Sequence, residues 1–197
     1  MKQRSALSQI VLIGLMAALV FVSSLISIPV PSVIGISRLH LGNIFCLLAG
    51  FLLGGWRGGL AAGLGSAIYD MTNPAYISEA PITFINKFML AFVCGVVASA
   101  LHASGTGKDG VQGRWFRCIV AAVAGSLTYV VLYLGKALVT DLFFLRTEWE
   151  TAMIDCGTRA ATSLINALIA VTLSVPLYRA LGVALRRARL GKFIEGV

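Results

Sequence analysis

Charged, amide and aromatic side chains recur inside or beside long apolar stretches of this chain, where they could hold a small polar solute. The residues that share this setting are Arg38, His40, Asn43, Tyr69, Asp70, Asn73, Tyr76, Asn86, Lys87, Tyr133, Lys136, Asp155 and Arg159. Together they offer cations, hydrogen-bond acceptors and aromatic faces, which is the make-up of a small-molecule binding site. Asp155 and Arg159 are four residues apart, so they could equally form an ion pair without any ligand.

The same residue types do not form a catalytic or metal-binding pattern. His40 and His102 lie far apart in the sequence, and no HExxH motif occurs. The four cysteines have no close Cys or His neighbour of the kind that builds a zinc site. We therefore expect a protein that is not an enzyme, with no metal site and no cofactor bound by this chain.

The composition indicates a membrane protein. Apolar residues make up 58% of the 197 positions and charged residues only 12%, whereas soluble domains have about 25% charged residues. Several apolar segments approach the roughly 20 residues that a helix needs to cross the hydrocarbon core. We expect an all-α integral membrane protein with a single membrane domain over residues 1–197. Its spans are predicted at about residues 8–28, 41–55, 58–70, 82–103, 116–140 and 151–181.

The positions of basic residues favour six spans with both termini in the cytoplasm. Lys and Arg in short loops stay on the cytoplasmic side. If residues 41–70 form a hairpin around Gly54 and Gly55, then Arg57, the loop 104–113 and the basic C-terminus all lie inside. A single long span over the same residues would place most of these cations outside.

This topology puts the polar residues at one depth, near the outer face. Tyr129 and Thr140 share the helical spacing of Tyr133 and Lys136, and Ser163 and Asn166 continue the series from Asp155 and Arg159. The individual alternatives remain open. The lysines at 87 and 136 could extend toward lipid headgroups, the tyrosines at 69 and 76 could belong to an interfacial belt, and the residues at 38 and 40 could simply flank the membrane.

The first span carries a face of small residues, Gly14, Ala17 and Ala18, that would let another helix approach closely. Such a face either packs within the protein or docks a partner subunit. The sequence alone is compatible with both.

Two stretches resemble the substrate-binding S components of energy-coupling factor (ECF) transporters. They are HLGNIFCLLAGFLLGGWRGGLAAGLGSAIYD over residues 40–70 and APITFINKFMLAFVCG over residues 80–95. The resemblance covers residues 10–100, while the second half matches only in span lengths. Asn43 stands where many relatives have Asp, and Gly55-Trp56 replaces a Gly-Pro turn.

The resemblance implies six helices and an outward-facing, vitamin-sized site in a multi-pass protein of the prokaryotic cell membrane. Asp70, Asn73, Tyr76, Asn86 and Lys87 would border this site. Gly14, Ala17 and Ala18 would dock on a membrane coupling (T) subunit, and two partner ATPase subunits would use the ATP.

The mixture of charges, amides and tyrosines favours a small heterocycle, such as hydroxymethylpyrimidine or a pyridoxine-like compound, over a metal ion. Pantothenate, riboflavin, folate and a deazapurine base remain open. The alternatives are an autonomous secondary transporter of small solutes and a membrane scaffold that transports nothing. We expect no nucleic-acid partner.

Overall fold

The computed structural model describes residues 6–74, 76–104 and 111–187. Its elements, in chain order, are α1 (Ala6–Leu25), β1 (Ser27–Pro31), β2 (Ile36–His40), α2 (Gly42–Met71), a 3-10 turn η1 (Ile77–Glu79), α3 (Ala80–Ser104), α4 (Val111–Val139), a π-helical turn η2 (Thr140–Phe144) and α5 (Trp149–Arg187). Within these residues, five helices are long and apolar enough to cross a membrane. Most of the predicted cytoplasmic loop, residues 105–110, lies outside the described residues.

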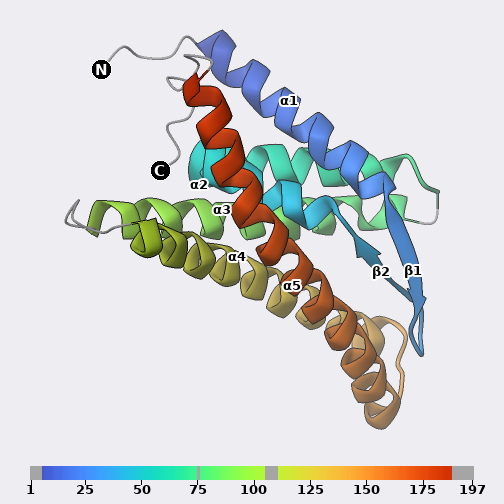
Figure 1. The fold of residues 1–197 in the computed structure, drawn as a ribbon. Coiled ribbons are helices and arrows are strands. Elements are labelled where there is room, and N and C mark those ends of the chain that lie inside the picture. The colour runs from blue at the N-terminus through green and yellow to red at the C-terminus, as the bar shows by residue number, and fades with distance from the viewer. Residues whose placement is uncertain (1–5, 75, 105–110, 188–197) are drawn as a thin grey trace.

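The helix α2 is one element that folds back on itself. Its backbone leaves the helical region at Gly54, where φ is 77°, a conformation that glycine adopts without steric cost. Beyond this break, Gly58 lies so close to the first arm that an added Cβ would be 2.6 Å from the carbonyl oxygen of Ala49. The sulfur of Cys46 and the hydroxyl of Ser66 also meet, at 3.9 Å. The two arms therefore run antiparallel (Figure 1).

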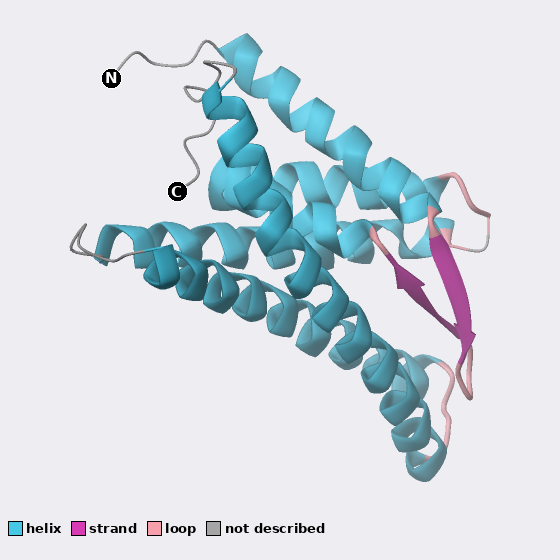
Figure 2. Ribbon diagram, viewed as in Figure 1, coloured by secondary structure: helices cyan, strands magenta, loops and turns pink. Residues whose placement is uncertain are grey.

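The all-α prediction omitted one feature, a β-hairpin between α1 and α2. The strands β1 and β2 pair in antiparallel register from Ser27 with His40 to Pro31 with Ile36. Figure 2 shows this hairpin at one end of the molecule, beside the end of α1. The prediction placed residues 27 and 28 at the end of the first span and residues 29–40 between two spans. The prolines at 29 and 31 interrupt any strand pattern in this segment. An isolated two-stranded sheet tolerates them, since every strand in it is an edge strand.

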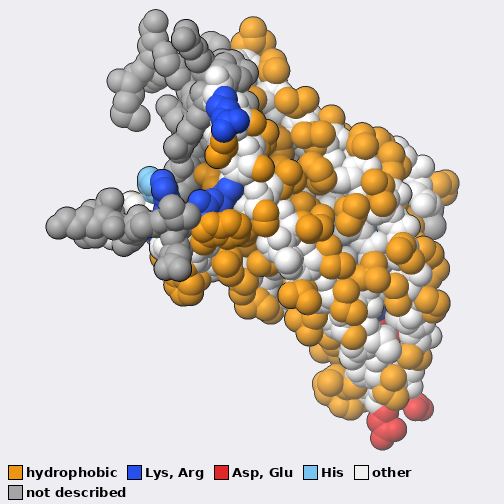
Figure 3. Space-filling view, in the orientation of Figure 1, with side chains coloured by type: hydrophobic (Ala, Val, Ile, Leu, Met, Phe, Trp, Pro, Cys, Tyr) orange, Lys and Arg blue, Asp and Glu red, His pale blue; other side chains and the backbone are white. Residues whose placement is uncertain are grey.

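The described helices bury two clusters of apolar side chains, a larger one and a smaller one that includes Met16 and Leu48. The fully buried members of the larger cluster include Val20, Leu47, Phe51, Leu90 and Ala121. Many other large apolar side chains face outward over much of the face drawn in Figure 3, as a bundle surrounded by lipid requires.

The elements are arranged so that the molecule has two distinct ends. α1 begins, α2 bends and α5 ends at one of them, which we call the terminal end. The β-hairpin, the turn after α2 and the turn between η2 and α5 lie at the other, which we call the hairpin end (Figure 1). The polar residues described below belong to the hairpin end.

Candidate functional site

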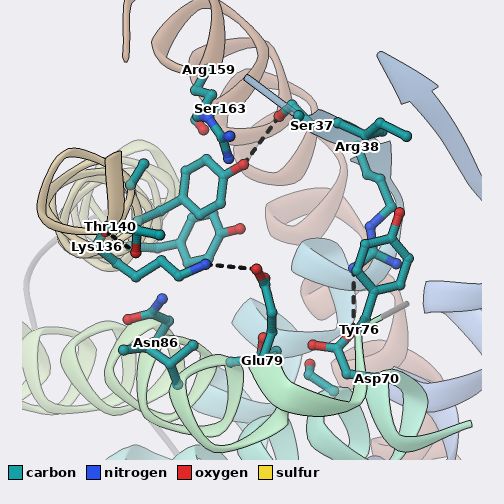
Figure 4. Close-up of a pocket in the computed structure, with 18 of the residues that line it drawn as sticks. Ser37, Arg38, Asp70, Tyr76, Glu79, Asn86, Lys136, Thr140, Arg159 and Ser163 are labelled. Carbon is teal, nitrogen blue, oxygen red and sulfur yellow. Dashed lines mark hydrogen bonds and ion pairs between the residues drawn. The ribbon is translucent and has the colours of Figure 1, made fainter. Parts of the chain in front are cut away.

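A cavity of about 440 Å³ opens among the β-hairpin, the end of α2, η1, the start of α3, the end of α4 and the start of α5. We call it the large cavity. Its volume falls within the roughly 300–1,000 Å³ typical of small-molecule sites. Figure 4 shows side chains from several of these elements converging on it.

Arg38 on β2 ties the hairpin to the end of α2. Its guanidinium donates to the Tyr69 hydroxyl and to the Asp70 carboxylate, both at 3.2 Å, and its carbon lies 3.8 Å from the centre of the Tyr76 ring. Burial by itself would lower the pKa of Arg38, but the charge and hydrogen bond of Asp70 outweigh it, so the pKa is raised. Arg38 is thus a fixed cation between two tyrosines and a carboxylate.

Lys87 on α3 lies almost fully buried at the floor of the large cavity. Its ammonium donates to the Asn43 side-chain oxygen at 2.5 Å, lies 3.3 Å from His40 Nε2 and sits 4.0 Å from the centre of the Tyr129 ring. Because an ammonium group can only donate, His40 Nε2 must accept and Nδ1 must carry the ring hydrogen. Burial, and then the charges of Lys87 and Arg38, lower the pKa of His40 well below its usual value, so the ring is neutral.

A third cation, Lys136 on α4, reaches across the large cavity toward η1. Its ammonium forms a 2.8 Å ion pair with Glu79, which is nearly half exposed (Figure 4). Such an exposed pair is weak and can be exchanged for a ligand at little cost.

The start of α5 holds the hairpin in place. Asp155, fully buried, forms an ion pair with Arg159 and accepts a hydrogen bond of 2.8 Å from the Ile34 backbone in the hairpin turn. About three turns after Asp155, the Asn166 side chain makes two hydrogen bonds with the backbone of β2: its oxygen accepts from the His40 nitrogen, and its nitrogen donates to the Arg38 oxygen. These contacts fix the side of the cavity that the hairpin forms.

Two stacked tyrosines on α4 form an aromatic wall. The rings of Tyr129 and Tyr133 lie 5.8 Å apart, and the Tyr133 hydroxyl is 3.3 Å from that of Ser37 on β2. Among the described residues, three buried polar atoms of the lining have no hydrogen-bond partner: His40 Nδ1, Asp70 Oδ2 and Asp141 Oδ2. A donor and two acceptors beside the cavity are therefore without a partner among the described residues.

Comparison with known proteins identifies this architecture. The family described as "ECF-type riboflavin transporter, S component" matches residues 4–182. The chain belongs to this family. No curated protein matches it significantly.

Two solved structures share the fold of this S component. ThiT from Listeria monocytogenes has a TM-score of 0.68 at 19% identity, with 90% of this chain and 96% of that chain covered. The S component of a bacterial ECF transporter has a TM-score of 0.58 at 18% identity, with the same coverage. The chain is therefore a multi-pass membrane protein of a vitamin-transporter family, whose members are transporter components and not enzymes.

Most of the predicted site residues meet at the large cavity of this S component. Those that line it are Arg38, His40, Tyr69, Asp70, Tyr76, Asn86, Lys87, Tyr133, Lys136 and Arg159. Asn43 and Asp155 do not line it but lie behind it, bonded to Lys87 and Arg159. Asn73 lies in the turn after α2, where its carbonyl accepts from the Tyr76 backbone at 2.9 Å, and it does not line the cavity either.

Several lining residues were not predicted as part of the site: Ser37, Glu79, Tyr129, Thr140, Asp141, Ser163 and Asn166. Helical spacing did place Tyr129, Thr140, Ser163 and Asn166 at the same depth as the predicted site, although they were not counted among its residues. Glu79 carried no such signal, because it lies in a turn whose direction the sequence does not fix.

The small residues on α1 do not share one surface. Gly14 and Ala18 are exposed, and an added Cβ on Gly14 would meet no atom within 4 Å. Ala17 is buried, and its carbonyl oxygen lies against Gly65 on the second arm of α2. Ala17 therefore packs within the protein, and only the other two residues are open to a partner.

Proposed function

We propose that this S component captures a water-soluble heteroaromatic vitamin or vitamin precursor in the large cavity. The observation that carries the proposal is the cavity itself, which combines four cations, three carboxylates and four tyrosines at one end of a membrane bundle. A purely structural protein has no need of so many polar groups in that setting, since they are costly to bury.

Each side of the cavity supports a part of this chemistry. The stacked pair Tyr129 and Tyr133 offers a face to an aromatic ring. The unpartnered atoms His40 Nδ1 and Asp70 Oδ2 supply a donor and an acceptor for the polar edge of a heterocycle. The ion pair between Glu79 and Lys136 would break when a ligand forms stronger interactions with the two side chains.

For the ligand, a hydroxymethylpyrimidine- or pyridoxine-like compound remains the first candidate from the residues. Riboflavin is the second candidate, and the family match favours it. A cavity of about 440 Å³ exceeds the needs of a one-ring precursor and admits a fused-ring vitamin. A one-ring precursor would leave part of the cavity unfilled, whereas a fused-ring vitamin would fill more of it.

We propose further that the hairpin end faces outward and that the two arms of α2 cross the membrane separately, giving six crossings with cytoplasmic termini. The exposed Gly14 and Ala18 on α1 would let a helix of a coupling (T) subunit approach. Two ATPase subunits bound to that subunit would supply the energy for import. Autonomous secondary transport is less well supported, because the large cavity lies at one end of the bundle and not at its middle.

A thermal-shift screen of the purified chain tests the ligand proposal. Binding to the folded state raises the apparent melting temperature by mass action, by an amount that grows with ligand concentration over Kd. The panel contains hydroxymethylpyrimidine, pyridoxine, riboflavin, pantothenate and folate. A shift with one heteroaromatic compound supports the proposal, and its identity chooses between the two candidates. A folded chain that responds to none of them contradicts the proposal.

A further inference from the structure

A second cavity, of about 250 Å³, lies at the terminal end, between α3, α4 and α5. We call it the small cavity. It is separate from the large cavity and shares no lining residue with it. Three arginines and a histidine line it, namely Arg114, Arg117, Arg179 and His102.

The charge of the small cavity is not balanced by its own lining. No carboxylate is among its described lining residues. All Asp and Glu residues of the described part of the chain occur in or next to the hairpin-end elements, and in Figure 3 the blue side chains gather at the opposite end from the red ones. The basic side chains therefore repel one another and favour an anion between them.

The side chain of Arg179 indicates most directly that the small cavity binds an anion. Its guanidinium carbon lies 4.4 Å from the centre of the Trp115 ring, which holds the side chain in place. Its Nη1 atom is buried and has no hydrogen-bond partner among the described residues. A buried, unpaired donor on a cation is costly, and an anionic oxygen satisfies it best.

A second arginine of the small cavity, Arg117, connects two of the helices around it. Arg117 donates from Nη1 to the Leu101 carbonyl at 3.1 Å, which joins the start of α4 to the last turns of α3. Arg114, one turn before it, is exposed. The small cavity is thus lined by one arginine that a hydrogen bond holds in place, Arg117, and by one that is exposed, Arg114.

The surroundings indicate the source of the anion. Phe116 and Val183 are 68% and 53% exposed, so apolar surface continues from the cavity onto the outside of the bundle. Trp115 is partly exposed beside them, and aromatic residues with arginines at a helix end are typical of the headgroup level of a membrane. Basic pockets between helices at this level bind anionic lipid headgroups.

We propose that the small cavity binds the phosphate group of an anionic phospholipid, with Arg179 and Arg114 holding the phosphate and the acyl chains lying along Phe116 and Val183. The lipid would join α3, α4 and α5 at the terminal end. This inference does not depend on the vitamin proposal, because it concerns a different cavity.

The test compares the purified, delipidated chain in nanodiscs of phosphatidylcholine with and without phosphatidylglycerol. Melting temperature and the number of retained lipids, counted by native mass spectrometry, are the two readouts. We expect phosphatidylglycerol to raise the melting temperature and to remain bound. In Arg179→Gln and Arg114→Gln the lipid should bind about tenfold more weakly, because each loses a charge-assisted hydrogen bond.

Arg57→Gln is the matched control, since Arg57 lies at the bend of α2, at the same end of the molecule, and does not line the small cavity. It should keep the full response. The Arg114→Gln variant separates loss of lipid binding from misfolding. Because Arg114 is exposed, its replacement leaves the buried residues of the small cavity unchanged. An equal response of all three variants overturns the proposal, as does saturation by inorganic phosphate alone. So does the absence of any lipid response, which would leave an acidic partner subunit as the occupant.

Discussion

Arg38 contributes two properties to the large cavity at once, a charge and a flat surface. Its guanidinium bonds Tyr69 and Asp70 while it stacks on Tyr76. Lysine would keep the charge but lose the planar fork and the stacking. We predict that Arg38→Lys weakens vitamin binding by about tenfold, which corresponds to roughly 1.4 kcal/mol, in equilibrium titrations of the purified chain.

The control for this variant is Arg146→Lys, because Arg146 is exposed in the turn before α5 and does not line the large cavity. It should bind the vitamin as tightly as the wild type. If Arg38→Lys also bound normally, the guanidinium geometry would have no part in recognition.

His40 predicts a pH dependence of stability. Its pKa is lowered well below the ordinary value of 6.5, first by burial and then by Lys87 and Arg38. As the pH falls below about 6.5, the unfolded chain takes up a proton that the folded chain refuses. The contribution of His40 is therefore complete above that pH and is lost as the pH falls toward the lower folded-state pKa.

The loss should reach at most about 1.4 kcal/mol per pH unit for this single group. His40→Gln has no titrating ring, so its melting temperature should fall less than that of the wild type between about pH 7.5 and about pH 5.5. If the melting temperatures of the two proteins fell by the same amount, the His40 ring would be protonated as easily in the folded state as in the unfolded state.

At the scale of the elements, α1 approaches the second arm of α2 closely at a glycine. Gly65 on the second arm of α2 lies against the Ala17 carbonyl oxygen, so an added methyl group has no room. We predict that Gly65→Ala destabilises the chain by about 1–3 kcal/mol, because overpacking forces the helices apart. The measurement is the melting temperature in detergent.

Gly157→Ala is the matched control on α5, where an added Cβ meets nothing within 4 Å. Alanine favours a helix over glycine by up to about 1 kcal/mol, so this variant should be unchanged or slightly more stable. Equal destabilisation of both variants would mean that glycine itself, and not close packing of α1, is what the structure requires.

The sequence predicts the elements better than their connections. Apolar length and charge bias predicted the helical segments and the break near Gly54. The β-hairpin was not predicted. It is anchored by hydrogen bonds to Asp155 and Asn166, which lie more than 100 residues away in the sequence. For the same reason, Lys87 could be grouped with the other polar residues, with which it lines the large cavity, but its bond to Asn43 could not be foreseen.

At the scale of the whole molecule, the two ends should face opposite sides of the membrane. Ser78 lies in η1 at the hairpin end, and Ser104 closes α3 at the terminal end. Both are exposed. In a background without other cysteines, Ser78→Cys should react with an impermeant maleimide on intact cells, and Ser104→Cys only after permeabilisation. Labelling of both from outside would refute the proposed orientation.

The central claim is that the large cavity at the hairpin end receives the vitamin. Thr83 lines this cavity and is half-buried, whereas Ser78 is exposed nearby and does not line it. In the same cysteine-free background, the rate of maleimide labelling of Thr83→Cys is measured with and without the compound that shifts the melting temperature. We predict that a saturating amount slows labelling at position 83 and leaves Ser78→Cys unchanged. Binding that leaves both rates unchanged would place the ligand elsewhere and contradict the account.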